Sequence, residues 1–403
     1  MIKNPTFEDR SAPRRLKLLF LVTEDWFFWS HRLAVARAAQ RNGYEVIVAT
    51  RVQRCAEQIR GEGFRLIPLQ LIRESYSPLN EFRAIQQIRQ IYRSEDPDIV
   101  HQVALKPVLY GSISALGRKN IPAVNALTGL GYLAASSTRK ARFLRLLIWN
   151  FFRLFLNKPH QRVIVENPDD KQLLIEKLKV SPERIVLIRG SGVDFQSFQP
   201  TAEPSGIPVV LLASRMLWIK GIVEFVEAAK MLRSKGLDAR FVLVGDTDPS
   251  SPSSVPRQQL LEWQSSGSIE WWGHQTDMPR IFEQASLVCL PSHGGEGVPT
   301  VLMEAAASGR AIVTTDVPGC RDIVRNGVNG RIVPPGDAVA LAEAIEELLK
   351  NSAMRQEMAR RGREIAVNEF SQEMIAEQTL ALYSELLKSR SSRVAKSLRN
   401  PKS

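Results

Sequence analysis

Residues 293–309 read HGGEGVPTVLMEAAASG, and an apolar run at residues 287–291 comes directly before them. Such a run, bounded by turn residues, is typical of a buried parallel strand. Gly294, Gly295 and Gly297 allow the backbone to turn tightly and to approach a ligand closely. The stretch therefore predicts a strand that ends in a glycine-rich turn.

A helix is expected to follow this turn. Pro299 suits the first helical position, where a missing N–H costs nothing, and apolar residues then recur at helical spacing until Gly309. Free backbone N–H groups and the positive end of the helix dipole meet at such a helix start. The unit thus predicts an anion-binding site.

Two carboxylates accompany this unit. Glu296 lies in the turn, and Glu304 lies eight residues later, inside the helix. Glu304 either binds a ligand or is an ordinary helix carboxylate on a solvated face; both interpretations fit its position. Together with a phosphate-binding helix end, the two acids suit a ligand that is anionic and rich in hydroxyls, such as a nucleotide sugar.

Glu296 and Glu304 match the E-x7-E signature of retaining glycosyltransferases of family 4, which have the GT-B fold. The residues around the two acids, and the stretches at 315–322 and 326–330, strengthen this resemblance. It covers residues 16–388 and is closest to the branch that builds bacterial capsule, O-antigen and other lipid-linked glycans. The resemblance implies that Glu304 accepts hydrogen bonds from ribose hydroxyls and that Glu296 positions the donor sugar.

The size and charge of the chain agree with such a protein. At 403 residues it exceeds the length at which a single core stops growing. The net charge of +12 favours anionic partners: a membrane surface, a nucleotide diphosphate or a nucleic acid. Three widely spaced cysteines read as reduced thiols in a cytosolic protein. The polar N-terminus shows no secretory signal, and we expect no transmembrane helix.

Apolar runs alternate with helical segments along the whole chain, which predicts an α/β protein with two Rossmann-like, doubly wound domains that face a cleft. By the resemblance, a C-terminal helix crosses back to the first domain. The expected segments are a disordered lead (1–15), an acceptor-binding domain (16–194), a linker (195–208), a nucleotide-sugar-binding domain (209–370), the returning helix (371–388) and a basic disordered tail (389–403).

Arg215 and Lys220 follow the first strand of the second half and match the R-x4-K-G donor motif of the resembling family. An arginine offers a planar fork to a phosphate, and a lysine offers a mobile charge. We expect both to stabilise the departing nucleoside diphosphate, with Glu296 as the third catalytic residue. Two surface cations at a helix start are the alternative. The donor-binding set is completed by Glu304, Gly295, Gly297, Val298, Pro299, Thr300, Gly245 and Gly273.

Asp246 and Asp248 form a D-x-D sequence after a strand, which is the metal signature of the other large transferase fold, GT-A. In the resembling family this place holds a glycine-rich turn that contacts the nucleotide. We therefore predict no metal site and no cofactor, and we expect activity to survive a chelator.

Acceptor-binding residues are expected at the carboxyl ends of the first strands, where open α/β sheets bind ligands. The predicted set is Trp29, His31 and Arg32 in a loop at residues 23–32, with Lys106 and Asn125 after later strands. The aromatic side chains of that loop are expected to form a wall of the acceptor site; the alternative is that they fill the core of the domain. The histidine that many family members carry after the fourth strand is absent.

Residues 138–157 are rich in Phe, Leu and Trp, carry several arginines and contain no acid. This pattern predicts a helix lying in the bilayer interface, with a helix buried in the domain core as the alternative. The protein is then peripherally bound to the cytoplasmic face of the inner membrane, with its basic tail as a second contact.

With the resemblance, these observations predict a hexosyl or N-acetylhexosaminyl transferase. Its expected donor is a UDP-linked nucleotide sugar, and its expected acceptor is a polyprenyl-diphosphate-linked glycan. The rivals are a GT-B sugar-nucleotide epimerase and a transferase with a soluble acceptor. A dinucleotide-binding oxidoreductase is disfavoured because no G-x-G-x-x-G follows the first strand. No nucleic-acid partner is expected, because no recognised nucleic-acid module is present.

Overall fold

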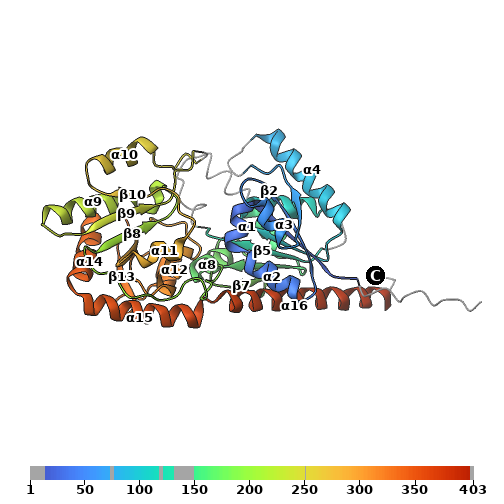
Figure 1. Cartoon of the computed structure of the whole chain (residues 1–403). Coiled ribbons are helices and arrows are strands. Elements are labelled where there is room, and N and C mark those ends of the chain that lie inside the picture. The colour runs from blue at the N-terminus through green and yellow to red at the C-terminus, as the bar shows by residue number, and fades with distance from the viewer. Residues whose placement is uncertain (1–13, 73–76, 118–120, 131–148, 250, 400–403) are drawn as a thin grey trace, which may run out of the picture.

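A computed structural model describes residues 14–72, 77–117, 121–130, 149–249 and 251–399 (Figure 1). Its first half is built on a seven-stranded parallel sheet with the order β3-β2-β1-β4-β5-β6-β7. The strands are β1 (Lys17–Glu24), β2 (Glu45–Arg51), β3 (Arg65–Pro68), β4 (Ile99–Val103), β5 (Ala123–Leu127), β6 (Gln161–Val165) and β7 (Ile185–Leu187).

The central strands of this first domain are buried on both faces, so their sequences are almost continuously apolar. In β1, for example, Leu18, Leu19, Phe20 and Leu21 are fully buried. Helices cover the sheet: α1 (Asp25–His31), α2 (Leu33–Arg41), α3 (Ala56–Gly61), α4 (Pro78–Glu95), α5 (Leu105–Ser114), a helix over residues 149–156, and α8 (Pro168–Glu176).

The second half is built on a six-stranded parallel sheet with the order β10-β9-β8-β11-β12-β13. Its strands are β8 (Val209–Ala213), β9 (Arg240–Val244), β10 (Glu270–Trp271), β11 (Leu287–Leu290), β12 (Ala311–Thr315) and β13 (Gly330–Val333). Its helices are α9 (Ile222–Ser234), α10 (Arg257–Ser265), α11 (Met278–Glu283), α12 (Thr300–Ala307), α13 (Cys320–Ile323), α14 (Ala338–Lys350) and α15 (Ser352–Glu369).

The two parallel sheets confirm the predicted fold class. Within the described part of the chain, residues 195–208, the expected linker, carry neither helix nor strand. Figure 1 shows the two domains side by side, with α15 beneath the second domain and α16 (Gln372–Arg399) beneath the first.

The return of α16 to the first domain is confirmed. Ile375, Tyr383 and Leu386 join the same hydrophobic cluster as Phe20 of β1. The Tyr383 hydroxyl also lies 2.5 Å from Nδ1 of the buried His101 in β4. Burial of this apolar face holds α16 on the first domain, whereas α15, the helix before it, packs on the second domain (Figure 1).

The predicted disordered tail is wrong as far as Arg399, because α16 continues to that residue without a break. Residues 389–399 contain neither glycine nor proline, and Arg, Lys and Ala favour helix. Arg390 also donates to the backbone carbonyl of Asp98 at 3.2 Å, which ties this part of the helix to the first domain.

The predicted loop at residues 23–32 is also wrong, because α1 occupies most of it. One carboxylate oxygen of the buried Asp25 accepts from the N–H of Trp26, and the other accepts from three successive N–H groups, those of Gln53, Arg54 and Cys55. These contacts hold the first turn of α1 against the segment that follows β2. A buried carboxylate serving distant backbone donors leaves no periodic signal in the sequence.

Of the predicted membrane helix, residues 138–148 lie outside the described residues, as do residues 1–13 of the predicted lead. In the described end, Phe152 and Leu156 are fully buried in a cluster with Val163 and Leu174, whereas Leu154 is 67% exposed. This end therefore packs on the first domain.

Candidate functional site

Residues 291–299, here called the glycine-rich loop, leave the carboxyl end of β11 and enter α12 (Figure 1). Gly294 and Gly295 have φ of 131° and 77°, values that side chains rarely permit. Pro299 is the N-cap of α12 rather than its first helical residue, one position earlier than predicted. The predicted strand, glycine-rich turn and helix are all present.

Glu296 of this loop is the centre of a compact polar group. Its two carboxylate oxygens lie 2.6 and 2.9 Å from Nζ of Lys220, and one of them also accepts from the Ser292 hydroxyl at 2.7 Å. The side chains of Lys220 and Glu296 are only 19% and 11% exposed. The structure thus brings together two residues that lie 76 positions apart in the chain.

The backbone places Lys220 at this point through Gly221. Lys220 ends a short 3₁₀ turn after β8, and Gly221 follows with φ of 74°. A Cβ at Gly221 would lie 2.0 Å from the carbonyl oxygen of Pro291 in the glycine-rich loop. The glycine after the lysine is therefore required by the close approach of two backbones.

Arg215 lies on the other side of this segment and pairs with Asp248. Its Nη1 is 2.8 Å from the Asp248 carboxylate. Asp246, the other acid of the D-x-D sequence, accepts from the N–H of Thr247 at 2.8 Å. Over the residues that the structure describes, no three His, Cys, Asp or Glu side chains form a group suited to a metal ion.

Glu304 lies on α12, half-buried, and none of the described residues forms a hydrogen bond with its carboxylate. Burial raises the pKa of this carboxyl to about 8. A carboxylate in such surroundings gains from any donor that satisfies it. Hydroxyl groups of a ligand would supply such donors.

Gly245 and Gly273 lie next to each other at the carboxyl ends of β9 and β10. The N–H of Gly245 donates to the carbonyl oxygen of Gly273 at 2.7 Å, and both residues have positive φ. A Cβ at Gly245 would lie 1.8 Å from the carbonyl oxygen of Ser214, whereas a Cβ at Gly273 would meet nothing within 4 Å. The two predicted glycines thus lie in neighbouring loops after β9 and β10, joined by this backbone hydrogen bond.

His31 reaches the second domain. Its ring stacks on Phe27, with centroids 4.1 Å apart, and its Nε2 lies 3.3 Å from the Thr300 hydroxyl at the start of α12. Burial lowers the pKa of His31 to about 3, so the ring is neutral at physiological pH. A neutral imidazole can accept or donate a hydrogen bond at its Nε2, depending on the tautomer.

The other predicted acceptor-binding residues, Trp29, Lys106 and Asn125, contact residues of the first domain. Trp29 packs against the core of the first domain, which agrees with the core-filling alternative. Lys106 donates to the Ile72 carbonyl and to Glu81. Asn125 is fully buried in β5 and donates to Gln161. The structure does not bring Asn125 to the surface beside the glycine-rich loop.

Two residues that the sequence did not single out contact the glycine-rich loop from the first domain. Glu166 and Asn167 follow β6, and both are buried. The Glu166 carboxylate accepts from the N–H of Val298 at 3.1 Å and lies 3.4 Å from Nη2 of Arg32, the other predicted acceptor residue. Buried polar residues directly after a strand, with Asn before Pro as a helix cap, were the available signal.

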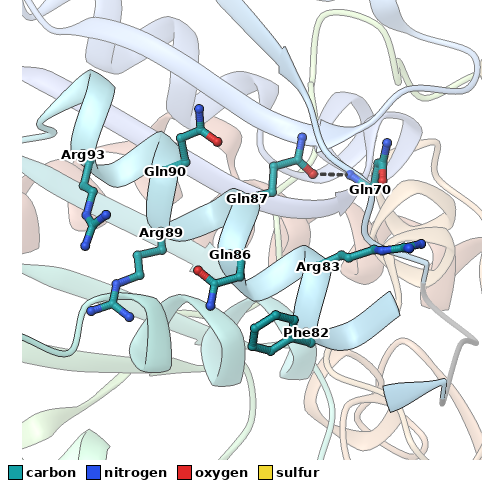
Figure 2. A pocket seen from close by; sticks show the side chains of 8 residues that line it. All are labelled: Gln70, Phe82, Arg83, Gln86, Gln87, Arg89, Gln90 and Arg93. Carbon is teal, nitrogen blue, oxygen red and sulfur yellow. Dashed lines mark hydrogen bonds between the residues drawn. The ribbon is translucent and has the colours of Figure 1, made fainter. Parts of the chain in front are cut away.

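A separate groove runs along the outer face of α4 (Figure 2). It is lined by arginines, glutamines and one phenylalanine, without an acidic side chain: Gln70, Phe82, Arg83, Gln86, Gln87, Arg89, Gln90 and Arg93. Figure 2 shows Arg89 and Arg93 on one side of the helix, Arg83 nearer to Gln70, and the hydrogen bond from the N–H of Gln70 to Gln87. None of these residues belongs to the glycine-rich loop.

Two family models match the chain. "Glycosyl transferases group 1" matches residues 207–351, and "Glycosyl transferase 4-like" matches residues 17–164. Together they cover the whole second sheet and the first sheet as far as Ile164 of β6. The chain therefore belongs to the family of glycosyltransferases with these two domains, and the predicted resemblance is confirmed.

Relatives that align over most of the chain include the N,N'-diacetylbacillosaminyl-diphospho-undecaprenol alpha-1,3-N-acetylgalactosaminyltransferase of Campylobacter jejuni. It is 27% identical over 93% of this chain and 100% of its own length. The UDP-Gal:alpha-D-GlcNAc-diphosphoundecaprenol alpha-1,3-galactosyltransferase of Escherichia coli is 25% identical over 73% of this chain and 77% of its own. Named relatives of this chain thus transfer sugars to undecaprenyl-diphosphate-linked glycans.

Solved structures confirm the GT-B fold. A sucrose-phosphate synthase from Thermosynechococcus elongatus matches with a TM-score of 0.76 and 21% identity, over 93% of this chain and all of that one. The Anabaena protein HepE in complex with UDP and glucose matches with a TM-score of 0.75 and 19% identity, over 92% and 100%. Among the described helices, none is both long and apolar enough to cross a bilayer.

Proposed function

We propose that this protein transfers a hexosyl or N-acetylhexosaminyl group from a UDP-linked nucleotide sugar to a polyprenyl-diphosphate-linked glycan, with retention at the anomeric carbon. The observation that carries the proposal is the Lys220–Glu296 pair at the glycine-rich loop. Glu304, on the helix that follows this loop, has no hydrogen-bond partner among the described residues. In this arrangement Lys220 can bind a diphosphate, and Glu296 and Glu304 can accept hydrogen bonds from the hydroxyl groups of the same ligand.

In this function, Lys220 and Arg215 bind the diphosphate and stabilise the charge that develops on it as the glycosidic bond breaks. Arg215 exchanges its contact with Asp248 for the phosphate. Glu304 accepts from ribose hydroxyls. Glu296 positions the donor sugar through hydrogen bonds from its hydroxyls. The N–H groups and the turns at Gly245, Gly273, Gly295 and Gly297 let the nucleotide sugar approach the backbone closely.

The acceptor binds from the first domain. His31 is the residue that the structure supports best for this role, because its Nε2 lies beside Thr300 at the start of α12. The acceptor class is supported by the two relatives named above, which act on diphospho-undecaprenol-linked sugars. The nucleotide is supported by the E. coli relative, whose donor is UDP-galactose.

A polyprenyl-linked acceptor remains at the membrane, so we further propose that the protein binds peripherally to the cytoplasmic face of the inner membrane. The groove along α4 supports this, because Arg83, Arg89 and Arg93 line it without an acid (Figure 2). Leu79 and Phe82 at the start of α4 are 57% and 59% exposed. Exposed apolar side chains beside cations are typical of surfaces that bind anionic lipid.

The decisive experiment measures transfer directly. Purified protein is incubated with UDP-glucose, UDP-galactose and their N-acetylated forms, each with a synthetic polyprenyl-diphosphate sugar. The proposal expects one pair to give an elongated lipid product with the anomeric configuration of the donor. Conversion of the nucleotide sugar without any acceptor would favour the epimerase, and an inverted product would refute retention.

Membrane binding is tested by flotation with vesicles of anionic phospholipid at physiological salt. We expect the wild type to float with the vesicles and the triple variant Arg83→Glu, Arg89→Glu, Arg93→Glu to remain at the bottom, because each cation near the surface contributes about 1 kcal/mol. UDP affinity serves as the control and is unchanged. A wild type that ignores these vesicles would refute this surface.

A further inference from the structure

The segment after β6 reaches from the first domain to the backbone of the glycine-rich loop. Glu166 and Asn167 are its first two residues, and they are 6% and 0% exposed. Neither belongs to the E-x7-E pair or to the R-x4-K-G motif. Two adjacent, buried polar side chains that leave their own domain require an explanation beyond the packing of that domain.

Three successive residues of the loop are held by these two side chains. The N–H of Val298 donates to Oε2 of Glu166 at 3.1 Å. Nδ2 of Asn167 lies 3.4 Å from the carbonyl oxygen of Glu296 and 3.3 Å from that of Gly297. The side chain of Glu296 therefore contacts Lys220 of its own domain, while its backbone carbonyl contacts Asn167 of the first domain.

The geometry around Gly297 shows how tightly the carboxylate fits. A Cβ at Gly297 would lie 1.9 Å from Oε2 of Glu166, so any side chain there would displace Glu166. The other oxygen of Glu166 lies 3.4 Å from Nη2 of Arg32, and the two side chains are 8% and 5% exposed. Arg32 thus supports Glu166 from α1 and α2, within the first domain.

We propose that Glu166 is a positioning residue for sugar transfer: it holds the glycine-rich loop against the first domain, so that Glu296 is correctly placed only when the two domains are closed around the donor. This role rests on the proposed function, since it concerns the same loop. It differs from donor binding, because Glu166 acts on the loop through Val298 and is assigned no contact with the nucleotide.

A clear separation of effects follows from this role. The nucleotide binds to residues of the second domain, so its affinity does not depend on Glu166. The rate of transfer does, because a displacement of about 1 Å at a reacting centre can cost a hundredfold. Loss of Glu166 should therefore lower kcat and leave the Kd for UDP nearly unchanged.

The test compares Glu166→Ala, Glu166→Gln and the matched control Asp169→Asn. Asp169 lies three residues later and also joins the two domains, through a 2.6 Å contact with Arg321, but the two side chains are 44% and 35% exposed. Exposed ion pairs contribute little, and the hydrogen bond of Asp169 goes to Arg321 of α13 rather than to the glycine-rich loop. Glu166→Gln keeps the size of the side chain and one acceptor oxygen for the N–H of Val298.

We expect kcat to fall at least tenfold in Glu166→Ala and less in Glu166→Gln, with the Kd for UDP within threefold of wild type and Asp169→Asn unaffected. Unchanged kcat in Glu166→Ala would overturn the proposal. So would an equal loss in Asp169→Asn, which would indicate general weakening between the domains. If the alanine variant does not fold, the glutamine variant decides by the same two measurements.

A second readout needs no substrate and separates this inference from the proposed function. Amide hydrogen exchange is followed in peptides that cover residues 294–300 of the free protein. Faster exchange in Glu166→Ala than in wild type and Asp169→Asn is expected, even if no sugar is transferred. Identical exchange in all three proteins would show that Glu166 does not hold the loop.

Discussion

Glu304→Gln replaces a half-buried carboxyl that has no hydrogen-bond partner among the described residues. Burial raises the pKa of Glu304 from 4.5 to about 8, so the folded protein binds a proton here more tightly than the unfolded chain. Between these two values, stability falls as the pH rises, because the folded state must either keep the proton or bury a charge. Glutamine is neutral at every pH and lacks this penalty.

The magnitude of this loss of stability follows from the pKa shift of Glu304. Each pKa unit corresponds to about 1.4 kcal/mol, so the full shift sets an upper limit of about 5 kcal/mol. Glu304 is only half-buried, and water screens the charged form. We therefore expect that raising the pH from 5 to 8.5 destabilises the wild type, relative to Glu304→Gln, by about 2 kcal/mol.

Thermal melting at the two pH values measures this difference. At pH 5 the two proteins should melt together, and at pH 8.5 Glu304→Gln should melt about 4–8 °C higher. Glu343→Gln, on an exposed face of α14, is the control and should follow the wild type at both values. A melting difference between Glu304→Gln and wild type that does not change with pH would refute the reasoning.

The same substitution tests the role of Glu304 in binding. Ribose hydroxyls donate to the charged carboxylate, so UDP should lower the pKa of Glu304 and release a proton near pH 7. Calorimetry in two buffers with different ionisation enthalpies measures this release. Glu304→Gln should bind UDP more weakly and release less proton. Equal release by both proteins would place the ribose elsewhere.

Three further outcomes follow from the site. Lys220→Ala should weaken UDP binding by about 2–3 kcal/mol, because a charge-assisted contact at a largely buried site is lost. Calorimetry measures this affinity, and Lys235→Ala, at the exposed C-cap of α9, is the control. Equal affinities of wild type and Lys220→Ala would exclude Lys220 from the diphosphate site. Glu296→Gln should keep the melting temperature within a few degrees and lower kcat about a hundredfold or more; wild-type turnover would remove Glu296 from the donor site. Transfer should persist in EDTA, because no three His, Cys, Asp or Glu side chains in the described part of the chain form a group suited to a metal ion; loss of transfer with rescue by a divalent cation would reassign Asp246 and Asp248 as metal ligands.

The sequence by itself determined the fold class, and it singled out residues of the second domain that the structure brings together in the candidate site. Buried parallel strands are almost wholly apolar, so most were visible as runs, and β5 and β8 occur at the predicted residues. The glycines of the glycine-rich loop were visible because a tight turn requires them, whereas Glu296, Lys220 and Gly221 were found through the E-x7-E and R-x4-K-G motifs of the resembling family. A tight turn involves near neighbours in the chain and therefore leaves a readable motif, whereas the close approach of Gly221 to Pro291 joins distant residues and is explained only by the structure.

Tertiary structure alone decided how the first domain contributes. Asn125 reads like a ligand residue at a strand end, but it is fully buried and bonded to Gln161. Glu166 reads like the end of a strand, yet its carboxylate meets the N–H of Val298, which lies 132 positions later. Contacts between distant segments depend on how the two domains pack, and no local pattern of residues encodes that packing.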